Sequence, residues 1–249
     1  YEGGGASFNS GVSFKLLDGQ KGFFDSDQII QAINPKNFYH SPMTKLVSLE
    51  NTTNKGGGYC WDISEFEKIQ KVCKENDLGL HMDGARIWNS IIAMNNDPKI
   101  YGNFFDTISV CLSKGLGCPI GSVLVGKGKV MEKAIRVRKI LGGGMRQVGY
   151  LAAAGLYALQ NNINRLSDDH RKAKEIAKKF SSKDIVNKIN SVETNIIIIE
   201  LNKSVNKQQI INHFTNHNVI FDWYSMGVQK IRIVTHLDYT EKNHEALLE

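Results

Sequence analysis

The chain has 249 residues, of which 41% are hydrophobic and 22% are charged, and its formal net charge is +6. This length and apolar content can bury a large core and suit one large and one small domain. Apolar runs such as residues 196–199 are far too short to span a bilayer, and the amino end does not resemble a signal sequence, so we expect a cytoplasmic protein. The lysines are spread among acids without an aromatic platform, which favours solvated helix faces over a nucleic-acid interface.

The cysteines and histidines do not predict a metal site. No CxxC pair and no zinc-like spacing occurs among the four cysteines, and reduced, mostly buried thiols are expected at Cys60, Cys73, Cys111 and Cys118. His213 and His217 are four residues apart, which suits a metal, but no third ligand is evident. A polar helix face is the better interpretation of this pair.

The first part of the chain alternates short apolar runs with helical patterns. We expect helices over residues 26–32, 130–140 and 147–159, another helix beginning after residue 62, and strands over residues 46–49, 78–82, 107–112 and 120–125. A strand, a helix of about a dozen residues and a second strand form the βαβ unit of a parallel sheet. The pattern therefore predicts an α/β fold with a mostly parallel sheet and flanking helices.

Two helix starts have capping signals. Ser26 is expected to cap the first helix. Asp62 is expected to cap the second, with Glu65 as its capping-box partner three residues later. The apolar positions of this second helix recur at helical spacing, at Phe66, Ile69 and Val72.

The helical pattern breaks near Asn161, and the remainder has its own rhythm of strands and helices. Short apolar runs that read as strands occupy residues 196–201, 219–221 and 231–234. We interpret this part as a smaller C-terminal α/β domain. The expected division places a large domain at residues 1–165 and a small domain at residues 166–249.

Asp83 and Lys114 carry the strongest chemical signal, because each follows an apolar run that reads as a buried strand. Ligands of open α/β sheets gather at the carboxyl ends of strands. A carboxylate and an amine meeting there suit pyridoxal phosphate (PLP): the carboxylate keeps the ring nitrogen protonated, and the lysine binds the aldehyde as a Schiff base. Ser113 is then placed to donate to the phosphate, while Gly115 and Gly117 allow a sharp turn.

Each motif alone is weak, since an Asp-Gly pair is usually a turn and a Ser-Lys-Gly triplet is usually a solvated loop. Four motifs in a fixed order are more specific: LENTTNKGGG at residues 49–58, DGAR at 83–86, CLSKGLG at 111–117 and RKILGGGMRQ at 138–147. With them the chain resembles the low-specificity L-threonine aldolases, which are fold-type I PLP enzymes. The likeness extends from residues 1–4 to residues 232–236.

The resemblance implies cleavage of L-threonine or L-allo-threonine to glycine and acetaldehyde by a PLP-bound homotetramer. It makes Lys114 the catalytic lysine and assigns the cofactor to Asp83, Arg86, Ser113, Lys114, Lys139 and Arg146. Lys139 and Arg146 flank a glycine-rich loop, and their counterparts look like phosphate ligands supplied across a subunit interface. Without the resemblance, this loop would read as an ordinary turn.

Two arginines are implied to hold the substrate. Arg232 corresponds to the residue that grips the α-carboxylate in two parallel hydrogen bonds, although an edge-strand surface arginine is its plain interpretation. Arg86 is similar to a residue near the ring oxygen of the cofactor and the substrate carboxylate. A salt bridge at a helix start is the alternative for Arg86. His81 shares a strand face with Asp83, and it either orients that carboxylate or is a satisfied core histidine.

Two departures from the family pattern stand out. At Thr53 many members carry a histidine proposed to help with the substrate hydroxyl proton, and a threonine is a poor general base. The upstream part that normally holds a phosphate-binding loop and a histidine stacked on the cofactor is absent from this sequence, so we expect a fragment. The alternatives are therefore another fold-type I reaction, such as β-elimination or racemisation, or a truncated, non-catalytic assembly subunit.

Overall fold

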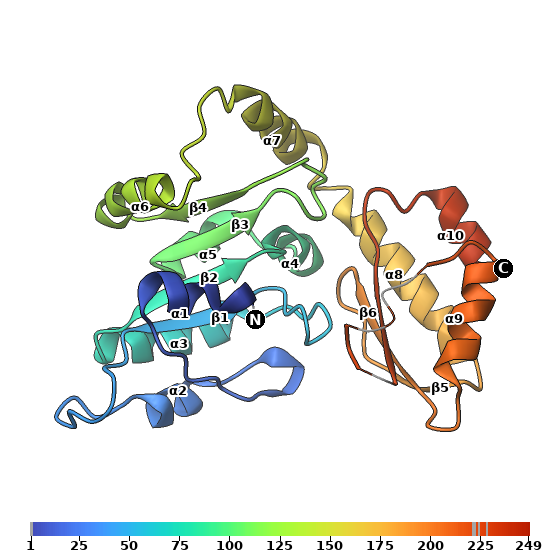
Figure 1. Ribbon diagram of the computed structural model, residues 1–249, viewed down its shortest axis with the longest axis horizontal. Coiled ribbons are helices and arrows are strands. Elements are labelled where there is room, and N and C mark those ends of the chain that lie inside the picture. The colour runs from blue at the N-terminus through green and yellow to red at the C-terminus, as the bar shows by residue number, and fades with distance from the viewer. Residues whose placement is uncertain (1, 221–222, 224, 228) are drawn as a thin grey trace.

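The computed structural model describes residues 2–220, 223, 225–227 and 229–249. Two sheets organise these residues, and Figure 1 shows them side by side, with helix α8 at their junction. The first sheet is built from residues 46–126 and the second from residues 186–234. Among the described residues, no helix is long and apolar enough to cross a membrane.

The first sheet has the strand order β1-β2-β3-β4. Strands β1, β2 and β3 are parallel, whereas β4 runs antiparallel to β3. The strand bounds are Leu46–Glu50 for β1, Gly79–Gly84 for β2, Thr107–Cys111 for β3 and Ser122–Gly126 for β4. The four strands expected in this part of the sequence and the mostly parallel sheet are therefore confirmed.

The two faces of this sheet differ in chemistry. Val47 and Leu49 of β1 and Leu80 and Met82 of β2 are buried in one apolar core. That core is completed by helices α3 (Ile63–Glu75), α4 (Ile87–Met94) and α5 (Pro98–Phe104). Because side chains alternate along a strand, Glu50 and Asp83 point to the other, polar face.

Two capping predictions need correction. Helix α2 (Ser26–Ala32) is capped by Asp25, which forms a capping box with Gln28, so Ser26 is the first helical residue rather than the cap. Asp62 does cap α3, through the backbone N–H of Ser64. Its expected partner Glu65 instead pairs with Lys68 at 2.6 Å, because an ion pair one turn along the helix is in easy reach of its carboxylate.

Three apolar positions of α3, Phe66, Ile69 and Val72, are buried as the spacing predicts. Beyond the first sheet lie α6 (Gly128–Ile140) and α7 (Gly149–Asn161), which confirm the two expected helices with small shifts at their ends. The amino-terminal residues form α1 (Gly5–Ser10) and the short 3-10 turns η1 (Glu2–Gly4) and η2 (Gln20–Gly22).

The second sheet is antiparallel, in the order β5-β6-β7. Its strands are β5 (Val186–Ile189), β6 (Ile196–Leu201) and β7 (Lys230–Val234), and its helices are α8 (Leu166–Ser181), α9 (Lys207–Asn216) and α10 (Glu241–Leu248). The strands expected at 196–201 and 231–234 are confirmed, and β5 was not expected.

The strand expected at residues 219–221 is not formed by its described residues. Val219 and Ile220 lie outside any strand, and Phe221 lies outside the described residues. The backbone N–H of Val219 donates to the carbonyl of Phe214 at the end of α9. The helix end thus uses the hydrogen-bonding capacity that a strand would need.

Candidate active site

The carboxyl ends of β1 and β2 bring two carboxylates together. Glu50 and Asp83 are register partners across the parallel pair. Asp83 is exposed, and its Oδ1 accepts a hydrogen bond from the backbone N–H of Ala85 at 3.0 Å, which fixes the turn that follows β2. The sequence prediction that Asp83 lies at a strand end is confirmed, while Glu50 was not predicted as a site residue.

Arg86 lies next to these carboxylates, at the N-cap position of α4. Its guanidinium is half-buried, and burial lowers its pKa, although Glu50 and Asp83 act in the opposite direction. Its buried Nη1 has no hydrogen-bond partner among the described residues. A buried guanidinium nitrogen of this kind is costly without a ligand, so Arg86 is suited to receive an anionic or carbonyl oxygen.

Lys114 lies in the loop between β3 and β4, and its side chain is exposed. Two side chains hold this loop from the other part of the chain. Arg165 Nη1 donates to the carbonyl of Gly115 at 3.0 Å, and Asn162 Nδ2 donates to the carbonyl of Leu116 at 2.8 Å. The loop is therefore positioned by the residues that precede α8.

Gly117 shows why the lysine loop needs glycine. Its φ is +75°, and a Cβ placed there would lie 2.7 Å from Leu237 Cδ2. Its backbone N–H donates to the carbonyl of Lys114 at 2.8 Å, closing a tight turn. Any other residue at position 117 would have a strained backbone, and its side chain would collide with Leu237.

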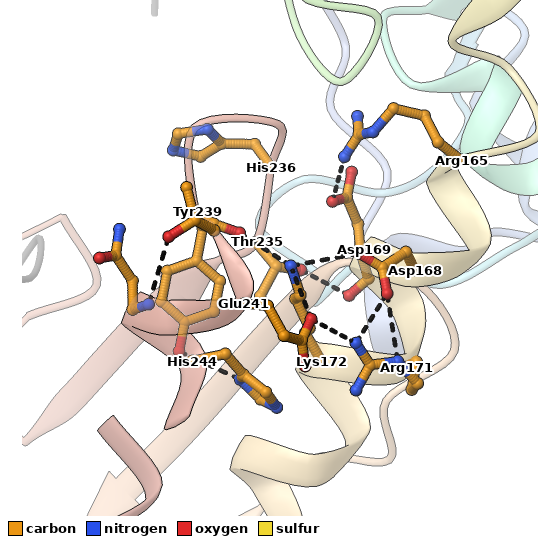
Figure 2. Close-up of polar contacts among 12 residues, drawn as sticks. Arg165, Asp168, Asp169, Arg171, Lys172, Thr235, His236, Tyr239, Glu241 and His244 are labelled. Atoms are coloured by element: carbon orange, nitrogen blue, oxygen red, sulfur yellow. Dashed lines mark hydrogen bonds and ion pairs between the residues drawn. The ribbon is translucent and has the colours of Figure 1, made fainter. Parts of the chain in front are cut away.

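Arg165 is itself oriented by a buried carboxylate, as Figure 2 shows. Its Nη2 pairs with Asp169 Oδ1 at 2.5 Å, and Asp169 is fully buried. The backbone carbonyl of Asp169 accepts a hydrogen bond from Thr235 Oγ1 at 2.7 Å, one residue beyond β7. Neither Arg165 nor Asp169 was predicted as a site residue, since their role depends on a contact 50 residues away in the sequence.

Glu50 is the main functional candidate that the sequence reasoning missed. Its Oε2 accepts the backbone N–H of Asn54 at 2.9 Å. Burial raises the pKa of its carboxyl, and Asp83 adds to this, while the Asn54 hydrogen bond and the positive charges of Arg86 and Lys114 lower it. The signal available in the sequence was its place at the end of a strand beside the Asp83 strand.

Together Glu50, Asp83, Arg86 and Lys114 form what we call the strand-end cluster. The four charges influence one another electrostatically, but no ion pair joins them in the described part of the chain. Two acids, one guanidinium and one amine are thus held at a sheet edge without neutralising each other by direct contact. Such an arrangement is typical of a ligand site rather than of a structural salt bridge.

The turn after β1 connects the two sheets. Thr53 is buried and forms an isolated bridge with Tyr59, and its Oγ1 has no hydrogen-bond partner among the described residues. Gly58 has a φ of +78°, and a Cβ there would lie 2.5 Å from Thr194 Oγ1. Thr53 is therefore part of a packed turn, which agrees with the absence of a basic side chain at this position.

Arg232 lies on β7, opposite Ile198 of β6. Its Nη2 donates to Asn54 Oδ1 at 2.6 Å, so the structure brings it to the turn that follows Glu50. Its neighbours Ile231 and Ile233 face the core of the second sheet. The guanidinium therefore faces the first sheet, on the same side as the strand-end cluster.

Other predicted residues are not brought into this cluster by the structure. Ser113 is exposed beside Lys114. Lys139, at the end of α6, and Arg146, in the connection to α7, are exposed, and within the described residues they make no hydrogen bond or ion pair with the cluster. Gly144 packs on Lys139, where an added Cβ would lie 2.8 Å from Lys139 Cδ.

The histidines behave mostly as structural residues. His81 Nδ1 lies 2.8 Å from Thr107 Oγ1, and burial lowers its pKa, which favours a satisfied strand histidine over a partner of Asp83. His217 Nδ1 donates to the carbonyl of His213 at 2.8 Å. Among the described residues, no group of three or more His, Cys, Asp or Glu side chains is suited to hold a metal.

This fold has known counterparts. The threonine aldolase of Leishmania major superposes with a TM-score of 0.81 at 20% sequence identity, over 98% of this chain and 71% of that chain. A likeness of this size with so little sequence identity establishes the fold. The chain has the fold of the fold-type I enzymes, a class that includes PLP-dependent aldolases and aminotransferases.

The sequence comparisons define the class more closely. Residues 1–204 match the beta-eliminating lyase family. Low-specificity L-threonine aldolase 1 of Arabidopsis thaliana is 43% identical over 204 residues, and low specificity L-threonine aldolase of Escherichia coli K12 is 35% identical over 245 residues. The matches cover 81% and 97% of this chain, and 57% and 70% of the relatives.

The chain therefore belongs to the beta-eliminating lyase family, and the resemblance to the threonine aldolases is confirmed. It spans little more than half the length of the Arabidopsis relative.

Proposed function

We propose that the chain carries the catalytic residues of a PLP-dependent aldolase that cleaves L-threonine or L-allo-threonine into glycine and acetaldehyde. The observation that carries this proposal is the strand-end cluster, where Asp83, Arg86 and Lys114 converge without forming ion pairs among the described residues. The relatives named for this activity support it. β-Elimination uses the same residues, but those names do not favour it.

The residues present fit PLP. Asp83 offers an exposed carboxylate at the end of β2, and Lys114 offers an exposed amine on a loop held by Arg165 and Asn162. Arg86 offers a buried guanidinium nitrogen that has no partner in the described part of the chain. Asp83 would bind the protonated ring nitrogen of PLP, and Lys114 would bond to its aldehyde carbon. Arg86 would donate to an oxygen of the cofactor or of the substrate. When bound, PLP withdraws the electron pair left on Cα after bond cleavage.

The cleavage requires a base, and we assign this role to Glu50. The hydroxyl proton of the substrate leaves, the Cα–Cβ bond breaks with its electron pair remaining on Cα, and Cβ departs as the aldehyde. Cα then takes up a proton to give glycine. Thr53 is buried in a packed turn and is a poor base, whereas the Glu50 carboxyl has a raised pKa and lies at the cluster.

The phosphate and the assembly complete the proposal. Ser113 supplies a hydroxyl next to Lys114, and Lys139 and Arg146 supply cations that this single chain does not bring to the cluster. We propose that Lys139 and Arg146 act on a neighbouring subunit within a homotetramer. Light scattering of the purified protein would contradict this if it gave a monomeric mass with PLP bound.

The decisive experiment is an absorption spectrum of the purified chain with added PLP, before and after borohydride, for the unsubstituted chain, Lys114→Ala and Lys99→Ala. Lys99 is exposed on α5 and serves as the matched lysine control. We expect a reducible band and a pyridoxyl group on Lys114 by mass spectrometry, lost only in Lys114→Ala. Threonine should then yield glycine plus acetaldehyde rather than a keto acid. The absence of any reducible band would reject activity for this chain.

A further inference from the structure

Two side chains between α7 and α8 hold the backbone of the loop at residues 112–121, which we call the Lys114 loop. Arg165 Nη1 donates to the carbonyl of Gly115 at 3.0 Å, and Asn162 Nδ2 donates to the carbonyl of Leu116 at 2.8 Å. These are the first and second carbonyls after Lys114. The peptide groups that follow the lysine are therefore held from outside the loop.

The Lys114 loop is also packed closely against α8. Leu116 is buried in one cluster with Leu166, the first residue of that helix. A Cβ added to Gly115 would lie 2.8 Å from Leu166 Cδ2, so the loop approaches the helix as closely as a residue without a side chain allows. This contact and the two hydrogen bonds together fix the loop backbone relative to α8.

The Arg165 guanidinium is directed by a carboxylate that the fold buries completely (Figure 2). Arg165 Nη2 pairs with Asp169 Oδ1 at 2.5 Å, while Asp169 Oδ2 has no hydrogen-bond partner among the described residues. Breaking a buried ion pair is destabilising, yet an apolar pair of similar size is often just as stable, and an unpartnered buried oxygen is costly. Stability alone therefore does not explain this pair, whereas the direction that it gives the guanidinium does.

Asp169 is in turn tied to the second sheet. Its backbone carbonyl accepts a hydrogen bond from Thr235 Oγ1 at 2.7 Å, and Thr235 directly follows β7. Thr235 exchanges two hydrogen bonds with Asn195, which directly precedes β6: its N–H donates to the Asn195 carbonyl at 3.0 Å, and Asn195 Nδ2 donates to its carbonyl at 2.9 Å. A continuous set of contacts thus runs from these strand ends through Asp169 and Arg165 to the Lys114 loop.

We propose that Arg165, oriented by Asp169, is a positioning residue for Lys114, which it acts on through the backbone of the Lys114 loop. This inference rests on the proposed function for the role of Lys114. A guanidinium suits the task because its nitrogens donate in fixed directions within one plane, so a carboxylate on Nη2 sets the direction of Nη1. The place of the lysine is therefore coupled to the packing of the second sheet.

Three variants separate this role from a purely structural one. Arg165→Met removes the donor to Gly115, and Asp169→Asn keeps an acceptor for Arg165 but removes the charge. The control is Arg171→Met, which lies on the same helix and removes only exposed ion pairs. Every measurement is made without urea and below the unfolding transition of each variant, so that the folded state alone is compared.

The first measurement needs no cofactor. Hydrogen exchange of residues 112–121, followed by mass spectrometry, reports on the N–H groups of Gly117 and Cys118, which donate to the carbonyls of Lys114 and Leu112. We expect this exchange to be about tenfold faster or more in Arg165→Met and a few-fold faster in Asp169→Asn. It should be unchanged in Arg171→Met.

The second measurement reports on the amine of Lys114. Each protein is titrated with PLP and reduced with borohydride, and the pyridoxyl groups on Lys114 and on exposed Lys99 are quantified by mass spectrometry. We expect the PLP concentration for half-labelling of Lys114 to rise about tenfold or more in Arg165→Met, while that of Lys99 in the same molecules stays constant. A purely structural Arg165 would leave the half-labelling of Lys114 in the folded protein unchanged.

Unchanged exchange of the Lys114 loop, or unchanged half-labelling of Lys114, in Arg165→Met would overturn the proposal. Equal changes in Arg171→Met would also overturn it, because Arg171 does not contact the loop. If Lys114 of the unsubstituted chain is never labelled, the proposed function fails, and the exchange rates then decide on their own whether Arg165 holds the loop. The two failures are thus distinguishable.

Discussion

Two charged regions of this molecule differ in whether their charges form ion pairs. In the strand-end cluster, Glu50, Asp83, Arg86 and Lys114 lie near one another, yet no ion pair joins them within the described ranges. In the second region, which we call the α8 network, each charge has a partner, as Figure 2 illustrates. Its members are Arg165, Asp168, Asp169, Arg171, Lys172, Glu175, Glu241 and His244.

The contrast separates charges that hold the fold from charges kept for a ligand. Lys172 is nearly buried, and its Nζ contacts Asp168 at 3.1 Å and the carbonyl of Tyr239 at 2.9 Å. His244 Nε2 lies 2.7 Å from Glu175 Oε2. These contacts tie α10 to α8. In the described part of the chain, the two carboxylates of the strand-end cluster accept hydrogen bonds only from the turns that follow their own strands, so substitutions there should change activity more than stability.

The largest expected effect is on turnover, from Asp83→Ala. The side chain is exposed and supports only its own turn, so the unfolding free energy should change by less than about 1 kcal/mol. If Asp83 holds the ring nitrogen of PLP as proposed, loss of its charge should lower kcat/KM for threonine by roughly 10²–10³-fold. Asp168→Ala in the α8 network is the control, and it should leave kcat/KM unchanged. If both variants lost activity equally, the distinction between the regions would fail.

A second prediction concerns Arg165, where the two regions meet. Arg165→Met leaves the buried Asp169 without its ion-pair partner and removes the hydrogen bond to Gly115. Because Arg165 is itself partly exposed, we expect a loss of about 2–3 kcal/mol, toward the low end for a broken buried pair. Arg171→Met, which removes only exposed pairs, should cost less than about 1 kcal/mol in the same urea unfolding series. Equal losses would show that burial does not set the difference.

His170 provides a pH test of the junction between α4 and α8. Its buried ring donates from Nε2 to Asn89 Oδ1 at 3.0 Å, and burial lowers its pKa to about 4. The unfolded chain therefore binds the proton more tightly, so stability is lost as pH falls from the unfolded value of 6.5 toward 4. Between pH 7 and pH 5 this amounts to about 2 kcal/mol. Urea unfolding of His170→Gln should lack this share of the pH dependence, and an unchanged slope would contradict the assignment.

Much of the fold was predictable from the sequence, because burial follows local periodicity. The apolar runs before Asp83 and Lys114 predicted two strands, and both strands are formed, although β2 is buried on one face only and β3 buries fully only Ile108. The runs at residues 219–221 and 26–32 show the limit of this reasoning. A short apolar run does not specify its hydrogen-bond partners, and the cap at Asp25 depended on Gln28 rather than on Ser26.

The site was predictable only in part, for a different reason. Asp83, Arg86 and Lys114 belong to motifs that can be recognised from the sequence alone. The contacts of Asn54 with Arg232 and of Arg165 with Gly115 join residues 178 and 50 positions apart, and no spacing in the sequence encodes them. Glu50 belongs to the motif at residues 49–58, but only the register of β1 and β2 shows that it lies beside Asp83.

The smallest predicted effect on stability comes from Glu50, and it tests whether this carboxylate serves function rather than the fold. Its folded-state pKa is raised above the ordinary value of 4.5, so the native chain binds the proton more tightly than the unfolded chain. The stability this provides is complete below pH 4.5 and is lost as pH rises through the folded-state pKa. At pH 8, Glu50→Gln should therefore stabilise the protein slightly, while keeping an acceptor for the Asn54 N–H.

The same substitution should lower kcat by roughly 10²-fold or more if Glu50 is the base. Glu67→Gln, on the exposed face of α3, is the matched control and should change neither quantity. Thermal melts at pH 4 and pH 8 give the stability effect, which should vanish at the lower pH, where Glu50 of the native chain is protonated. If Glu50 lowers the stability of the fold at pH 8 and raises turnover, its role is in the reaction, as we propose for the strand-end cluster. A destabilised Glu50→Gln with normal kcat would instead assign Glu50 to the fold, alongside the α8 network.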